Sequence, residues 1–356
     1  MELAEALVQV FHAMVLRAPA PKLRELPSSE EWQSERLRVA CISSHPSVLP
    51  SPEEIGKAAG FPVLHSDRRA ILSDKGAFTP LPAIDDELNR FHGVRFGCSK
   101  DCRRAEAHLL KSIDVSLEQG AHIIIANELA YPVGPDGISN KFRRTIQNRS
   151  RQGGALILPG TYHDIGKDAS WFNILPIFYP GGRLSGADVK AHLKVNTASK
   201  CDERVREPFE KIAPYYLWNG LRILPLICLD VFDFSIVMSY ARSVLIGRGY
   251  RALDLVIVPS YSGRKRDLIE GLCKAISYLL AVPVALVDSQ AGRAHRCLVE
   301  GAYCESALRG LRIEHDDLIT VYDWPITYFR SLQSTELEER ASSQEWNIIV
   351  KRGRVL

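Results

Sequence analysis

Short apolar runs alternate with amphipathic segments along most of this chain, and this alternation limits the folds that it can adopt. The amphipathic segments, with apolar residues at helical spacing, lie at 101–120, 141–152, 234–246 and 268–280. The apolar runs, which are typical of buried strands, lie at 38–43, 121–126, 155–159, 222–228, 255–259 and 282–287. Strands that alternate with helices indicate an α/β protein in which helices cover the sheets.

Other segments indicate that the sheets are mixed and not purely parallel. The Gly181-Gly182 turn lies between the apolar segments 172–178 and 184–192, and this pattern predicts a β-hairpin. Further strands are expected at 296–299 and 318–322. Hairpins among strand–helix units favour a layered sandwich of mixed sheets.

Composition and segment boundaries predict one large domain with additions. The chain has 356 residues, of which 46% are hydrophobic and 24% charged, as in ordinary globular proteins. We expect an N-terminal helix and linker over 1–35, a main domain over 36–330 and a C-terminal tail over 331–356. Residues 46–97 are rich in Pro and Gly and are interpreted as an insertion, a feature often associated with function or partner binding.

Net charge, hydropathy and the N-terminal residues argue against several classes of protein. With 45 basic and 42 acidic residues the formal net charge is +3, which argues against a dedicated nucleic-acid binder. No apolar stretch approaches the ~18 residues that span a bilayer. The N-terminus carries Glu2 and Glu5 and lacks the positive start of a secretory signal. We therefore expect a cytoplasmic protein that binds neither nucleic acid nor membrane.

The eight cysteines are expected to stay mostly reduced in that compartment. The pairs Cys98-x3-Cys102 and Cys297-x6-Cys304 lack the tight spacing of a structural zinc site. The sequence therefore predicts no metal, and most of the cysteines are interpreted as small buried side chains.

Three polar residues, Cys228, Glu128 and Lys190, each close an apolar strand-like run. A thiolate is a strong nucleophile, but a thiol is mostly protonated near neutral pH. Glu128 could take the proton of Cys228 and return it to a leaving amine. Lys190 could stabilise the oxyanion of a tetrahedral intermediate. The three together predict an acyl-transfer site with a cysteine nucleophile.

In their order along the chain these motifs resemble the nitrilase (carbon–nitrogen hydrolase) superfamily. The matching segments span about residues 36–325 and are 120–129, with Glu128; 172–173, 181–182 and 190–193, with Lys190; 227–230, with Cys228; 254–260; and 284–288. Asn127 stands where the family commonly has proline, and Phe232-Asp233-Phe234 replaces its aromatic-proline-glutamate. The chain is identified as a divergent member.

The resemblance implies a four-layer αββα sandwich with two mixed sheets. It implies hydrolysis of a non-peptide carbon–nitrogen bond in a small amide, N-carbamoyl compound or nitrile, with an amide expected ahead of a nitrile. The reaction passes through a thioester on Cys228 and needs no metal or organic cofactor. Self-association into a homodimer or a higher homo-oligomer is also implied.

The resemblance further implies a second, assisting glutamate, assigned to Glu203 with Glu207 as the competitor. Ser260, Tyr261 and Asp288 are expected near the rim of the substrate pocket. His192 is interpreted as a structural histidine, because Glu128 already serves as the proton acceptor.

Two other functions stay open. The chain could be a nitrilase-fold subunit for assembly or signalling in a larger complex, such as a defence system. Residues 1–35 and 46–97 would then bind a protein partner. A cysteine protease is less consistent, because His192 lies only 36 residues before Cys228 (228 − 192) and no Cys-Gly-Ser-Cys-Trp signature is present.

Overall fold

A computed structural model gives the fold of the 356-residue chain. The structure describes residues 23–26, 36–43, 79–80, 94–95, 99–134, 137–165, 171–182, 190–193, 215–233, 236–237, 240, 253–260, 266–280, 282–288, 310–311 and 319–325.

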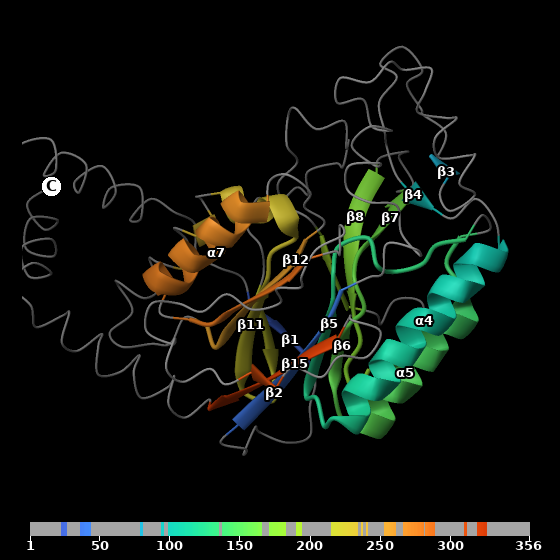
Figure 1. Ribbon diagram of the computed structural model, residues 1–356, viewed down its shortest axis with the longest axis horizontal. Helices are drawn as coiled ribbons and strands as arrows, with labels where there is room; N and C mark the ends of the chain where they lie inside the picture. The colour runs from blue at the N-terminus through green and yellow to red at the C-terminus, as the bar shows by residue number, and fades with distance from the viewer. Residues whose placement is uncertain are drawn as a thin grey trace, which may run out of the picture.

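Two five-stranded sheets form the centre of the described structure (Figure 1). The first has the order β14 (Gly310–Leu311), β15 (Ile319–Pro325), β2 (Arg36–Ile42), β5 (Ile123–Ala126) and β6 (Leu156–Leu158). The second has the order β1 (Leu23–Glu25), β10 (Tyr215–Trp218), β11 (Leu221–Pro225), β12 (Leu255–Ser260) and β13 (Val284–Asp288). Both contain parallel and antiparallel neighbours, so both are mixed, as predicted.

A third, antiparallel sheet consists of β7 (Tyr162–Ile165), β8 (Trp171–Ile177) and β9 (Lys190–Leu193). The predicted hairpin corresponds to β8 and β9, with Ile177 opposite Lys190. Just beyond β8, Phe178 forms a reciprocal backbone bridge with Ile157 of β6. This bridge joins the hairpin to the edge of the first sheet. The short strands β3 (Thr79–Pro80) and β4 (Val94–Arg95) pair with each other.

The side chains of the first sheet alternate between two cores. In β5, Ile123 and Ile125 lie in the core between the two sheets, whereas Ile124 and Ala126 lie in the core under the helices. Strand β5 contacts β12 of the second sheet, so the two sheets face each other. Because both faces are buried, a strand of this kind consists almost entirely of apolar residues, and this explains the run at 121–126.

Helices form the outer layers. Helices α4 (Ser99–Glu118) and α5 (Asn140–Gly153) lie side by side over the first sheet, and α7 (Arg266–Leu280) lies on the opposite side of the sandwich (Figure 1). Buried residues of α7, among them Ile269 and Ile276, join the core that contains the second sheet. The order helix, sheet, sheet, helix is the predicted αββα sandwich.

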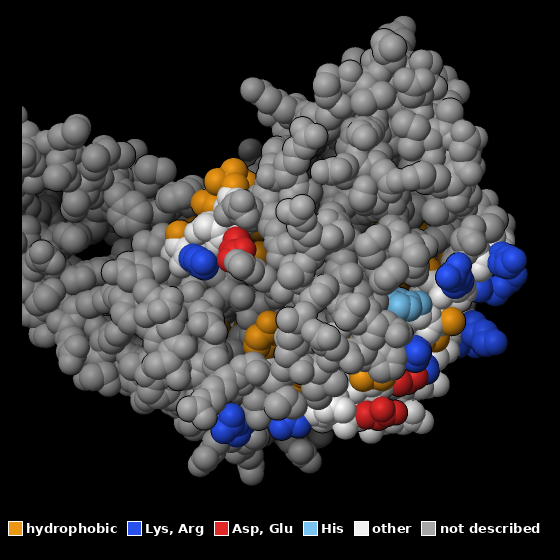
Figure 2. Space-filling view, in the orientation of Figure 1, with side chains coloured by type: hydrophobic (Ala, Val, Ile, Leu, Met, Phe, Trp, Pro, Cys, Tyr) orange, Lys and Arg blue, Asp and Glu red, His pale blue; other side chains and the backbone are white. Residues whose placement is uncertain are grey.

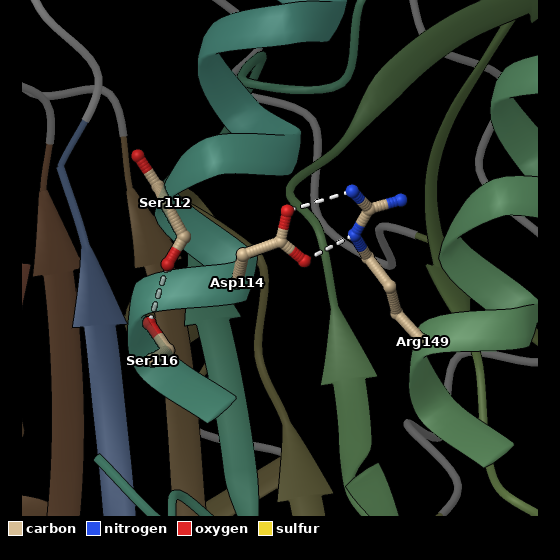
Figure 3. A network of polar contacts seen from close by, with 4 residues as sticks. All are labelled: Ser112, Asp114, Ser116 and Arg149. Carbon is tan, nitrogen blue, oxygen red and sulfur yellow. Dashed lines mark hydrogen bonds and ion pairs between the residues drawn. The ribbon is translucent and has the colours of Figure 1, made fainter. Parts of the chain in front are cut away.

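An ion pair joins the two helices that cover the first sheet. Asp114 of α4 accepts hydrogen bonds from Nε and Nη2 of Arg149 of α5, the second at 2.7 Å (Figure 3). On the same helix, Ser116 Oγ donates to the Ser112 carbonyl at 2.7 Å. The Asp114 side chain is 43% exposed, so solvent screens the pair and its contribution is about 0.2–1 kcal/mol.

Basic side chains lie on the outer face of α5, where Arg144 and Arg151 are exposed. Lys and Arg side chains gather over α4 and α5 in Figure 2. Arg149 pairs with Asp114, and Arg151 Nη2 donates to the Gly182 carbonyl at 2.7 Å. Within the described parts of the chain, none of the helices has the length and apolar character that crossing a membrane requires.

Candidate active site

Glu128 lies in a buried turn just beyond the end of β5. Its side chain is 4% exposed. Asn173 of β8 donates from Nδ2 to Glu128 Oε1 at 2.9 Å, and Asn173 itself is fully buried. A surface or capping role for Glu128 is therefore excluded, because this carboxylate sits inside the protein with a side-chain amide bound to it.

Hydrogen bonds between side chains and the backbone hold the Glu128 turn in place. The Leu129 N–H donates to Thr161 Oγ1 at 2.9 Å, and Asn127 Nδ2 donates to the Glu128 carbonyl at 2.7 Å. Leu129 has φ +60°. Gly160 lies against the same turn, where an added Cβ would come within 2.5 Å of the Asn127 carbonyl oxygen. The turn is thus fixed from the side of β6 and β7.

Cys228 lies in a sharp turn after β11 and is the first residue of the 3-10 helix η2 (Cys228–Phe232). Its φ is +48°, and its side chain is 7% exposed. The fully buried Asp230 closes this turn, since its Oδ2 accepts from the Ile227 N–H at 2.9 Å. The strand predicted over 222–228 ends earlier, at Pro225, so Cys228 follows the strand and does not belong to it.

Ser260, the last residue of β12, donates from Oγ to Cys228 Sγ at 3.6 Å. It is fully buried. Ser260 pairs in register with Asp288, the last residue of β13, which is 5% exposed. Two of the residues expected at the rim of a pocket thus lie inside the protein, and one of them contacts the predicted nucleophile. Tyr261 falls outside the described residues.

Lys190 is the first residue of β9 and lies opposite Ile177 of β8. Asn173, which binds Glu128, is in the same β8 strand. One hairpin therefore carries both the partner of Glu128 and the predicted lysine. Glu203 and its competitor Glu207 lie outside the described residues.

Other cysteines have surroundings unlike those of Cys228. Cys41 in β2 and Cys273 in α7 are both fully buried. Both belong to the core that extends from between the sheets to the inner side of α7. Burial raises the pKa of the Cys273 thiol, and the nearby Glu270 and Asp288 raise it further. A protonated thiol of this kind is a poor nucleophile. In the part of the chain that the structure describes, no group of His, Cys, Asp and Glu side chains could hold a metal ion.

A cavity of about 490 Å³ lies between α4 and α5, away from these residues. Its lining includes Cys102, Arg103, Glu106 and Lys141, and it contains none of the predicted site residues. Burial raises the pKa of Glu106, while the Ser139 hydrogen bond and the nearby Arg103 and Lys141 lower it.

Sequence reasoning missed the contacts of Asn173 and Ser260. Asn173 was part of the motif that indicated the hairpin, but nothing in its spacing marked it as the partner of Glu128. The donor and acceptor are 45 positions apart and meet only once β5 and β8 are folded. Ser260 was identified, but its contact with the sulfur depends on where β12 ends.

Comparison with known proteins identifies the fold. No protein-family model matches the chain, and no curated protein matches its sequence. A double mutant of the amidase from Nesterenkonia sp. AN1 in complex with acrylamide has a TM-score of 0.50 at 13% identity, and the match covers 87% of this chain and 98% of that one. That amidase belongs to the nitrilase superfamily.

Two further solved structures have lower scores. Nit3 of Saccharomyces cerevisiae, from branch 10 of the nitrilase superfamily, has a TM-score of 0.49 at 13% identity, and the match covers 85% of this chain and 96% of that one. Another amidase structure from Nesterenkonia sp. has a TM-score of 0.47 at 17% identity, with coverage of 67% and 90%. With the alignment at a TM-score of 0.50, the chain has the nitrilase fold.

Proposed function

We propose that this chain, which has the nitrilase fold, is a carbon–nitrogen hydrolase that cleaves a small non-peptide amide through a thioester on Cys228. The observation that carries the proposal is the conformation of Cys228, a buried thiol held at φ +48° in a turn directly after a strand. An N-carbamoyl compound or a nitrile is the alternative substrate class. In all three classes a thiolate adds to an electrophilic carbon that bears nitrogen.

The turn at Cys228 supports a nucleophile assignment on energetic grounds. A non-glycine residue in the left-handed region costs about 1–3 kcal/mol, and such strain collects at functional sites. Strained strand-to-helix turns also carry the nucleophile in other hydrolases, because the turn presents the reactive atom at the end of a sheet. The Ser260 hydroxyl at 3.6 Å from Sγ supports the same role, since a donor to sulfur favours the thiolate.

In the proposed acylation, Glu128 accepts the Sγ proton while Sγ attacks the carbonyl carbon and forms the C–S bond. The ammonium of Lys190 stabilises the resulting oxyanion. Glu128 then gives its proton to the nitrogen, the C–N bond breaks, and ammonia or an amine leaves. The burial of the Glu128 carboxylate and its fixed turn support this role, because proton transfer requires a group in a defined place.

In the proposed deacylation, water attacks the thioester carbon and Glu128 takes the proton of that water. The tetrahedral intermediate collapses, the C–S bond breaks, and the acid is released while Sγ regains its proton. Glu203, with Glu207 as the competitor, is proposed to assist this proton transfer. Neither step requires a metal or an organic cofactor.

Ammonia release tests this function. The full chain is incubated with primary amides, N-carbamoyl amino acids and aliphatic nitriles. We expect the wild type to release ammonia from at least one class. Cys228→Ala should lower the rate by roughly 10³-fold or more, because it removes the nucleophile.

Cys273→Ala is the matched control, because it removes another buried thiol, and it should retain the wild-type rate. Release from none of the three classes, or turnover retained in Cys228→Ala, contradicts the proposal.

A further inference from the structure

We infer that Asn173 is a positioning residue that orients Glu128 for proton transfer with Cys228. The inference rests on the proposed function, in which Glu128 is the base. Its structural basis is the 2.9 Å hydrogen bond from Asn173 Nδ2 to Glu128 Oε1. Both side chains are buried, with exposures of 0% and 4%.

A side-chain amide suits this task chemically. The Nδ2 group can only donate, so its bond fixes Oε1 as an acceptor and sets the orientation of the Glu128 carboxyl group. A hydrogen bond to a charged group is also stronger than one between neutral groups.

The position of Asn173 within β8 makes it a rigid support. Strand β8 is paired on both sides, with Asn173 opposite His163 of β7 and Ile177 opposite Lys190 of β9. The same strand therefore links the Glu128 partner to the predicted lysine. A site built on paired strands holds its groups more precisely than a site built on loops.

Beyond β8 the chain is anchored by a second buried amide. Gln147 of α5 donates from Nε2 to the Tyr179 carbonyl at 2.8 Å, and Gln147 is 2% exposed. This bond resembles that of Asn173 in type and burial, but it ends on a backbone carbonyl and not on Glu128. Gln147→Met is therefore a control for the purely structural effect of losing a buried amide near this strand.

The test uses the rate at which iodoacetamide alkylates Cys228, followed by mass spectrometry of the Cys228 peptide near neutral pH. This readout reports activation of the thiol and does not depend on the substrate. The variants are Asn173→Ala, the isosteric Asn173→Asp, Glu128→Gln, Gln147→Met, and the double variant Asn173→Ala with Glu128→Gln. Thermal melting of each variant shows whether it is folded, and Asn173→Asp keeps the test valid if the alanine variant fails to fold.

We expect Asn173→Ala and Asn173→Asp each to slow alkylation by about tenfold or more, since base catalysis contributes about 10²–10⁴-fold in enzymes. Adding Asn173→Ala to Glu128→Gln should change the rate by less than about twofold, because the two side chains act as one unit. Gln147→Met should lower the melting temperature while leaving the alkylation rate near that of the wild type.

The outcomes distinguish a failure of the Asn173 assignment from a failure of the proposed function. If Glu128→Gln slows alkylation but the Asn173 variants do not, the inference is wrong and the proposed function stands. Additive effects of Asn173→Ala and Glu128→Gln, or equal slowing by Gln147→Met, also overturn the inference. If Glu128→Gln leaves the rate unchanged, the base assignment in the proposed function fails, and the inference fails with it.

Discussion

Three non-glycine residues among those that the structure describes have positive φ, namely Leu129, Asn219 and Cys228. Asn219 is explained by the turn between β10 and β11, where Asn219 at +48° and Gly220 at +78° form the Asn-Gly pair that hairpins favour. Leu129 and Cys228 have no such explanation. Leu129 follows the proposed base and Cys228 is the proposed nucleophile, so the strained residues of the described structure adjoin the proposed site.

The strain at Cys228 predicts an unusual order of stability between two substitutions. Both Cys228→Ala and Cys228→Gly remove the thiol, but only glycine adopts φ +48° without strain. We expect the glycine variant to be more stable than the alanine variant by about 0.5–1 kcal/mol, from a left-handed cost of about 1–2 kcal/mol offset by the flexibility of glycine. Urea denaturation measures this difference.

Cys273 provides the control, because it lies within α7. There the order should reverse, with glycine about 1 kcal/mol less stable than alanine. An alanine variant that is the more stable at both positions would show that the turn at Cys228 is unstrained.

At the residue level the sequence predicted where the residues of the proposed site lie relative to the strands, but not their contacts. Glu128 and Cys228 could be found because each directly follows an apolar run that folds as a buried strand. The Asn173–Glu128 and Ser260–Cys228 hydrogen bonds could not be found, because each joins segments whose distance depends on strand register and on where the strands end.

At the level of elements, the turn that carries Glu128 depends on the connection between β6 and β7. Gly160 in this connection has φ +90°, and a Cβ there would lie 2.5 Å from the Asn127 carbonyl oxygen and 2.6 Å from Ala130 Cβ. Gly160→Ala should therefore displace the Glu128 turn and lower both stability and turnover. Urea denaturation and ammonia release measure the two effects.

Gly154 at the end of α5 is the matched control. Its φ is +63°, but an added Cβ would meet nothing within 4 Å. Gly154→Ala should cost only the left-handed strain of about 1–2 kcal/mol and leave turnover unchanged in the folded fraction. Equal losses of turnover in both variants would contradict a specific role for Gly160.

The strands that the sequence predicted best are those buried on both faces, such as β5 and β12, since they are continuous apolar runs. Strands β1, β7 and β10 were missed. They have three or four residues each, and β1 is an exposed strand at the edge of a sheet, so neither length nor hydrophobic pattern distinguishes them. The predicted helix over 234–246 is described only at residues 236–237 and 240, which are helical.

At the level of the whole molecule, the alternation of strands and helices predicted a layered sandwich of mixed sheets, and the resemblance to the nitrilase superfamily added the four-layer order. The predicted domain boundaries stay predictions, although Leu23–Glu25, within the expected N-terminal linker, pairs with β10. Self-association and a protein partner also stay predictions.

The outer surface of helix α7 is mixed in character. It carries the exposed Leu268 next to the Glu270–Lys274 ion pair. Hydrophobic and charged side chains are visible over α7 in Figure 2.

The buried tyrosines predict how the stability of the molecule changes at high pH. Burial raises the pKa of Tyr216 from 10.0 to about 12, against the opposing effect of Arg24. The native state therefore keeps a proton that the unfolded chain loses above pH 10. This stabilisation is complete below pH 10 and is lost as the pH rises toward 12.

Urea denaturation between pH 9 and 12 measures this loss. The free energy of unfolding of Tyr216→Phe should fall less steeply with pH than that of the wild type. Burial also raises the pKa of Tyr131 and Tyr240, so some decline should remain in the variant. Identical slopes for the two proteins would show that Tyr216 ionises as easily in the native state as in the unfolded chain.

The central claim is that Cys228 forms a covalent acyl intermediate, and mass spectrometry of acid-quenched enzyme tests it most directly. The enzyme is mixed with a substrate amide from the ammonia-release screen and quenched during turnover, and its peptides are then analysed. The account predicts a peptide containing Cys228 that is heavier by the acyl group of the substrate, and no such adduct in Cys228→Ala. Two results would contradict this claim. One is turnover with the acyl group attached to another residue. The other is turnover that forms no adduct and is undiminished in Cys228→Ala.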